Sequence, residues 1–169
     1  LRVTQAVQKR DWLALDSARK QLVDAGFAAF AAPVIEAWGR FGRGDTAGAL
    51  KLLDPASQEG FGRAYLVEHR GHVLAAAKRW DEAAAAYGTL LSDNGVQIVR
   101  IRLAAASALQ AAGNKAQARR VLDAGGHLAA FEIALAKLAA NQPIRGGVED
   151  PRAGISGLFT RMAADLSRD

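Results

Sequence analysis

The chain of 169 residues is half hydrophobic, which suits one ordinary domain with a core, and it contains no run of about 18 apolar residues that could cross a membrane. Cysteine is absent, so the composition excludes disulfides, thiolate metal sites and cysteine nucleophiles. The 22 basic and 17 acidic residues give a formal net charge of +5, which is only weak evidence for a nucleic-acid partner.

Four stretches of the chain share one pattern at intervals of 34 or 35 residues. They are RDWLAL (10–15), GDTAGA (44–49), KRWDEA (78–83) and GNKAQA (113–118). Their alignment places four residues in one column, namely Leu15, Ala49, Ala83 and Ala118. Such a regular interval indicates an internal repeat. Because alanine is abundant and aromatic residues make up only 7%, we predict an all-α protein whose helices approach closely.

Each of these stretches begins where we expect a tight turn between two helices. The turn residues are Arg10, Gly44, Lys78 and Gly113, and the residues that follow as candidate helix caps are Asp11, Asp45 and Asn114. Arg79 breaks the cap column, but Asp81 and Glu82 place negative charge in the first turn of the next helix, where the helix dipole favours it. The predicted unit is therefore helix, turn, helix, with one extra residue in the turn at 42–44.

The first helix of the second unit shows the apolar spacing of a helix with one buried face. Its stripe consists of Val34, Ala37, Trp38 and Phe41, at i, i+3, i+4 and i+7. This spacing predicts that Trp38 belongs to the core.

The unit from Ala64 to about Gly95 resembles the tetratricopeptide repeat family. The matching residues are Gly71 at the small position of the first helix, Leu74 after it, Trp80 after the turn, Ala83 at the small position of the second helix and Tyr87 at its aromatic position. The resemblance implies an α-solenoid of stacked helix-turn-helix repeats wound as a right-handed superhelix. Residues 1–125 would form the repeats, the first of them partial.

Residues 126–169 follow the repeats and are expected to pack on the solenoid or to cap it. We predict a helix over residues 127–140, a loop containing IRGGVED, and a last helix that begins at Asp150-Pro151. The last helix carries one apolar face that must be buried, made of Ile155, Leu158, Phe159, Met162 and Leu166.

A solenoid of this kind lines a concave surface with the first helices of its units. The resemblance places partner-binding residues on that surface, which are Tyr65, Glu68, His72, Arg100, Leu103, Ser107 and Gln110. The expected function is a non-enzymatic scaffold or adaptor that binds a peptide or protein segment. Two alternatives stay open: an accessory domain for a small molecule, a cell-wall fragment or a lipid, and a structural segment that packs on further repeats or on a second copy.

Other candidate sites are weaker. Glu68, His69 and His72 share one helix turn, which cannot close a tetrahedral site, so we predict no metal and no cofactor. We find no catalytic constellation, and the arginine pairs 100/102 and 119/120 lack the interleaved aromatic residues of single-strand binders. The alanine and arginine bias is typical of a bacterial protein from the cytoplasm or periplasm. We expect that the natural N-terminus, which would decide the compartment, is absent, because the chain starts at Leu1.

Overall fold

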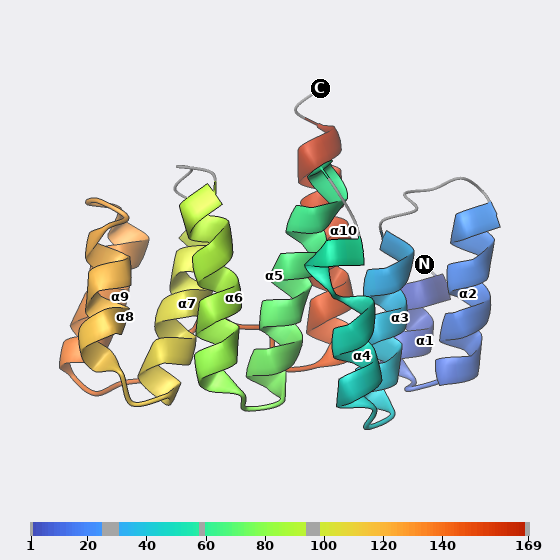
Figure 1. Ribbon diagram of the computed structural model, residues 1–169, viewed down its shortest axis with the longest axis horizontal. Helices are drawn as coiled ribbons and strands as arrows, with labels where there is room; N and C mark the ends of the chain where they lie inside the picture. Colours follow the sequence, from blue (N-terminus) through green and yellow to red (C-terminus); the bar gives the residue numbers. More distant parts are fainter. Residues whose placement is uncertain (1, 25–30, 58–59, 94–98, 168–169) are drawn as a thin grey trace. The chain divides into compact units, whose positions relative to one another are not determined.

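A computed structural model describes residues 2–24, 31–57, 60–93 and 99–167 (Figure 1). All regular elements within these ranges are helices, which confirms the all-α prediction. Gly95, at the end of the best-matching repeat, lies outside the described residues. The right-handed superhelix stays a prediction.

The chain divides into two compact units, and the division falls within one helix, α5 (Gly60–Ala76). Residues 1–69 and 149–169 form the first unit, which contains α1 (Arg2–Gln8), α2 (Trp12–Asp24), α3 (Ala31–Gly42), α4 (Thr46–Leu52), a 3-10 turn (Pro55–Ser57), the start of α5 and α10 (Pro151–Leu166). Residues 70–148 form the second unit, which contains the rest of α5, α6 (Trp80–Asp93), α7 (Val99–Ala111), α8 (Lys115–Asp123) and α9 (Ala129–Ala139).

The four predicted turns have the same backbone geometry. In each turn, the residue that follows the turn residue donates its backbone N–H to the carbonyl five residues before it. Asp11 donates to Ala6 at 2.9 Å, and Asn114 donates to Leu109 at 2.8 Å. The turn residues all have a positive φ, which is 53° at Arg10, 89° at Gly44, 60° at Lys78 and 84° at Gly113. These are the bonds of a Schellman helix end. The turn at 42–44 has them too, so the extra residue expected there is wrong.

Side-chain caps follow three of these turns. Asp11, Asp45 and Asn114 each accept a hydrogen bond from the backbone N–H three residues ahead, at 3.0, 2.8 and 3.1 Å. Arg79 occupies the fourth cap position and pairs with Glu82 instead, from Nε to Oε1 at 2.7 Å and from Nη2 to Oε2 at 2.6 Å. The predicted cap column and its exception are both confirmed.

The residues of the aligned column lie in the packed interior of their units. Leu15, Ala49, Ala83 and Ala118 are all completely buried. In the second unit, the ring of Tyr87 fills the space left by the missing side chain of Gly71, because a Cβ there would lie 2.5 Å from Tyr87 Cε1. Tyr87 is itself completely buried. Ala83 and Tyr87 thus place one face of the alanine-rich stretch of α6 in the packed interior, while Ala85 is exposed.

The two C-terminal helices belong to different units. In the second unit α9 packs on α7 and α8, and its Phe131 and Leu138 join a core that includes Leu122 and Ile144. In the first unit α10 packs against α1 and α3. Trp38 is completely buried there, as its apolar spacing predicts.

Lys78 occupies a left-handed turn position that Gly44 and Gly113 occupy without strain. The left-handed conformation costs a non-glycine residue about 1–2 kcal/mol, and glycine gives back about 0.5–1 kcal/mol through its flexibility in the unfolded chain. We expect Lys78→Gly to raise the free energy of unfolding by about 0.5–1 kcal/mol in urea titrations, and the reverse change, Gly113→Lys, to lower it. If both changes shifted the free energy of unfolding in the same direction, the repeated turn geometry would be contradicted.

Gly71 and Gly88 provide a matched pair for the crossing between α5 and α6. A Cβ at Gly71 would collide with Tyr87, whereas a Cβ at Gly88 would meet no atom within 4 Å. Overpacking costs about 1–3 kcal/mol, while alanine gains about 1 kcal/mol over glycine within a helix. We expect Gly71→Ala to lower the melting temperature and Gly88→Ala to raise it. A stabilising Gly71→Ala would show that Tyr87 does not need this space.

Candidate functional site

Tyr65 and Glu68, two of the predicted partner-binding residues, face α10 within the first unit. The hydroxyl of Tyr65 donates a hydrogen bond to Oδ2 of Asp165 at 2.6 Å, and Nη1 of Arg161 donates to the carboxylate of Glu68. The Arg161 guanidinium also lies over the Tyr65 ring, 3.8 Å from its centroid, and its Nε is 3.4 Å from Asp165. We call these four residues the α5–α10 cluster.

Two members of the cluster, Tyr65 and Glu68, are shielded from solvent, and Arg161 and Asp165 are partly exposed. Tyr65 is completely buried and Glu68 is 4% exposed. The open surface expected for these two residues is therefore not found, because α10 lies over them. Burial, followed by the hydrogen bond to Asp165, raises the pKa of the Tyr65 hydroxyl well above its ordinary value. Glu68 is paired with a cation, as a buried carboxylate must be if it is to stay ionised.

His72, which was also expected on an open surface, is buried in the second unit. Its Nδ1 lies 2.8 Å from the hydroxyl of Tyr87, so it forms part of the crossing between α5 and α6. Its neighbour His69, in the first unit, accepts a hydrogen bond at Nδ1 from Nε1 of Trp38 at 3.1 Å. Both imidazoles are thus engaged by aromatic side chains. Among the residues that the structure describes, no group of three histidines and carboxylates could hold a metal ion.

The predicted residues of α7 contact an extended part of the same chain. The side-chain amide of Gln110 donates to the carbonyl of Gln142 at 2.9 Å and accepts from the N–H of Ile144 at 2.8 Å. The hydroxyl of Ser107 donates to the carbonyl of Ile144 at 2.9 Å. One amide side chain therefore satisfies both a donor and an acceptor of the extended main chain. This pairing fixes the direction of the extended main chain and its position along α7.

Further along the same segment, the backbone passes directly over α7. A Cβ at Gly146 would lie 2.2 Å from the carbonyl carbon of Leu103, so only glycine permits this approach. Leu103 is half-buried beneath it. Ile144 is 4% exposed and anchors the segment in the core of the second unit. Arg100, at the start of α7, is exposed.

Five of the seven predicted residues, which are Tyr65, Glu68, Leu103, Ser107 and Gln110, contact one feature that the sequence analysis did not identify as their occupant. It is the stretch of residues 142–165, which we call the C-terminal segment. In the second unit it meets Leu103, Ser107 and Gln110, and in the first unit it meets Tyr65 and Glu68. Two signals could have shown it: Gly146-Gly147, which allows close passage, and Arg161 with Asp165, a charge pair beside an apolar helix face.

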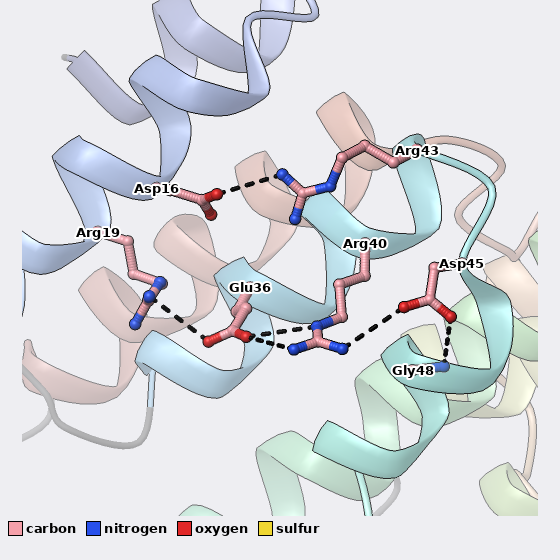
Figure 2. Close-up of polar contacts among 7 residues, drawn as sticks. All are labelled: Asp16, Arg19, Glu36, Arg40, Arg43, Asp45 and Gly48. Carbon is pink, nitrogen blue, oxygen red and sulfur yellow. Dashed lines mark hydrogen bonds and ion pairs between the residues drawn. The ribbon is translucent and has the colours of Figure 1, made fainter.

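A second arrangement of polar side chains lines a charged cleft of about 390 Å³ between α2, α3 and the start of α4 (Figure 2). Glu36 is central to it and pairs with Arg19 at 3.5 Å and with Arg40 at 3.1 Å. Arg40 continues to Asp45 at 3.5 Å. Arg43 pairs with Asp16 of α2 at 3.2 Å. The cleft is lined by Asp16, Arg19, Lys20, Glu36, Arg40, Arg43 and Asp45.

The charges in this cleft largely compensate one another. Each of its carboxylates is already paired with an arginine, and Asp45 also caps α4 through the N–H of Gly48 at 2.8 Å. An anionic ligand would have to compete with these carboxylates for the same guanidinium groups. The pairs across the cleft therefore join α2 to α3 and favour a structural role for it.

Comparisons with known proteins found no matching family model, no similar curated sequence and no similar solved structure. The tetratricopeptide resemblance therefore stays a prediction that rests on the repeat residues themselves. No helix in the described part of the chain combines the length and the apolar character needed to cross a membrane.

Tyr65 should make the free energy of unfolding depend on pH in the alkaline range. Tyrosine in the unfolded chain titrates near pH 10, and its pKa in the folded state is higher, so the folded state holds this proton more tightly. The stability contributed by Tyr65 is therefore complete below about pH 10 and is lost as the pH rises through the folded pKa. Between about pH 10 and 12, we expect the unfolding free energy of the wild type to fall more steeply than that of Tyr65→Phe, by up to about 1.4 kcal/mol per pH unit. Parallel slopes in urea titrations would contradict this.

Proposed function

We propose that this protein is a non-enzymatic scaffold that binds a polypeptide segment of a partner protein on faces made by the first helices of its helix pairs. One observation carries the proposal: five of the seven residues expected to hold a partner segment contact the chain's own C-terminal segment. Tyr65 and Glu68 bind a helix, while Ser107 and Gln110 bind an extended stretch. These faces thus have the chemistry needed to hold polypeptide.

The contacts divide into two kinds, as in other modes of peptide recognition. Gln110 and Ser107 bond to main-chain atoms, which any residue except proline offers in full, so they support affinity without reading the sequence. Tyr65 and Glu68 contact Asp165 and Arg161, so they select particular side chains. A partner of the α7 face would present an extended stretch, and a partner of the α5 face would present a charged amphipathic helix.

A small-molecule site receives little support from the charged cleft. Ligand pockets are mostly apolar with a few polar groups, whereas the charged cleft is lined by paired charges. The second candidate is a structural role in a longer array of helices. It is favoured by α2, where Leu13 is 83% exposed and Val23 is 43% exposed, because apolar side chains on one helix can pack on further helices.

Photo-crosslinking in cells of the source organism can test both candidates. We would place p-benzoylphenylalanine at Arg100 on α7, at Leu13 on α2, and at Ala116 on α8 as an exposed control, then identify cross-linked peptides by mass spectrometry. The scaffold proposal predicts that position 100 links to one segment of one partner protein and that position 116 does not. Cross-links from position 13 alone would support the structural role, and equal yields at positions 100 and 116 would contradict the scaffold.

A further inference from the structure

The side chains of α10 that contact the other helices of the first unit lie along one face of α10. Ile155, Leu158 and Met162 are buried, and Arg161 and Asp165 enter the α5–α10 cluster. Together with Gly154 they occupy positions i, i+1, i+4, i+7, i+8 and i+11. This is the spacing of an amphipathic helix with one buried face, which is also the spacing that a helix uses when it binds in a groove. The outward residues, such as Ser156 and Thr160, are exposed.

The receiving face is formed by α1, α3 and α5, and we call it the α1–α3–α5 face (Figure 1). At its centre the ring of Trp38 lies against α10, because a Cβ at Gly154 would be 2.1 Å from Trp38 Cε2. The Trp38 ring is held by its hydrogen bond to His69. This face therefore accepts only a very small residue opposite Trp38. Glu68 can pair with a cation of the bound helix, and the Tyr65 hydroxyl can donate a hydrogen bond to an acceptor.

Two glycines weaken the interior of α10 as a helix, while Asp150 caps its start by accepting from the N–H of Ala153 at 2.9 Å. The helix contains glycine at 154 and again at 157, and a Cβ at Gly157 would meet no atom within 4 Å. Packing explains Gly154 but not Gly157. Each glycine in a helix interior disfavours helix formation by about fivefold relative to alanine. The two glycines therefore increase the share of the stability of α10 that comes from packing on the α1–α3–α5 face.

We infer that the α1–α3–α5 face is a binding site for an amphipathic helix of a partner protein and that α10 occupies this site in cis as a displaceable ligand. The partner helix would carry a small residue opposite Trp38, apolar residues at the next two turns, and an arginine and an aspartate four residues apart that meet Glu68 and Tyr65. This inference rests on the proposed scaffold function and names the partner class for one of its faces.

A weak cis ligand suits such a competition. A segment tethered to its own site has an effective concentration on the order of millimolar, which a free partner must overcome. A partner helix with alanine in place of Gly157 would regain about fivefold in helix formation while making the same contacts. Gly157 thus lowers the occupancy of the site by α10 without changing the face that the partner meets.

The test uses the full chain and a fluorescently labelled peptide of residues 149–167 carrying Gly157→Ala as the probe. Binding would be measured by fluorescence anisotropy to the wild type and to two variants, Gly154→Val, which collides with Trp38 and weakens α10, and Gly157→Ala, which strengthens it. We expect the probe to bind Gly154→Val at least tenfold more tightly than the wild type, and the wild type about fivefold more tightly than Gly157→Ala. Equal binding to all three folded proteins would overturn the inference.

A second set of changes protects the test against misfolding of Gly154→Val. In Arg161→Ala/Asp165→Asn the apolar face of α10 is kept and only its cluster contacts are lost, so the probe should again bind more tightly than to the wild type. A probe with Arg161→Glu should lose binding to this variant and regain it when Glu68→Arg is added to the protein. Failure of this charge exchange in a folded variant, judged by circular dichroism, would also overturn the inference.

The outcomes separate this inference from the scaffold proposal. The probe assay uses no natural partner, so probe binding without any cross-link from Arg100 in cells would support the helix site and contradict partner binding on α7. A cross-linked partner with no probe binding would do the reverse. Light scattering on the wild type and on Gly154→Val gives one further outcome. If the wild type is a dimer and the variant a monomer, α10 is exchanged between copies, which would overturn the assignment of α10 as a cis ligand.

Discussion

The structure depends on close contact between neighbouring helices, which requires small residues at the points where they cross. Ala49, Ala83 and Ala118 are completely buried at equivalent places, and Gly71 leaves its space to the ring of Tyr87. Alanine contributes little apolar area, so stability must come from many shallow contacts along each helix more than from a few large side chains. The large side chains that are present, such as Trp38 and Phe131, are correspondingly well buried.

Features that repeat along the chain could be predicted from the sequence. The turns at Arg10, Gly44, Lys78 and Gly113 have one geometry, and the cap column breaks at Arg79 as the sequence predicts. These features depend on residues within one turn of helix, so a single sequence contains the whole signal. The spacing that assigned Trp38 to the core is local in the same way.

The occupant of the candidate site could not be predicted in this way. Glu68 and Arg161 are separated by 93 positions and Tyr65 and Asp165 by 100, and no periodicity relates such distant residues. The resemblance placed Tyr65 and Glu68 on a binding surface, and they do contact a polypeptide segment, but that segment belongs to the same chain. His72 was misplaced for a different reason, since a polar residue on a first helix can equally well face the second helix, where Tyr87 gives it a partner.

The way in which Gln110 holds the extended segment has a consequence for how this protein can evolve. Its amide bonds only to main-chain atoms of Gln142 and Ile144, so the side chains at 142 and 145 are not needed for attachment. Random substitution can therefore change these exposed positions freely, while Ile144 and Gly146 remain constrained by the core and by the backbone of Leu103. Descendants of this chain could diversify the outer surface of the segment while keeping its path along α7.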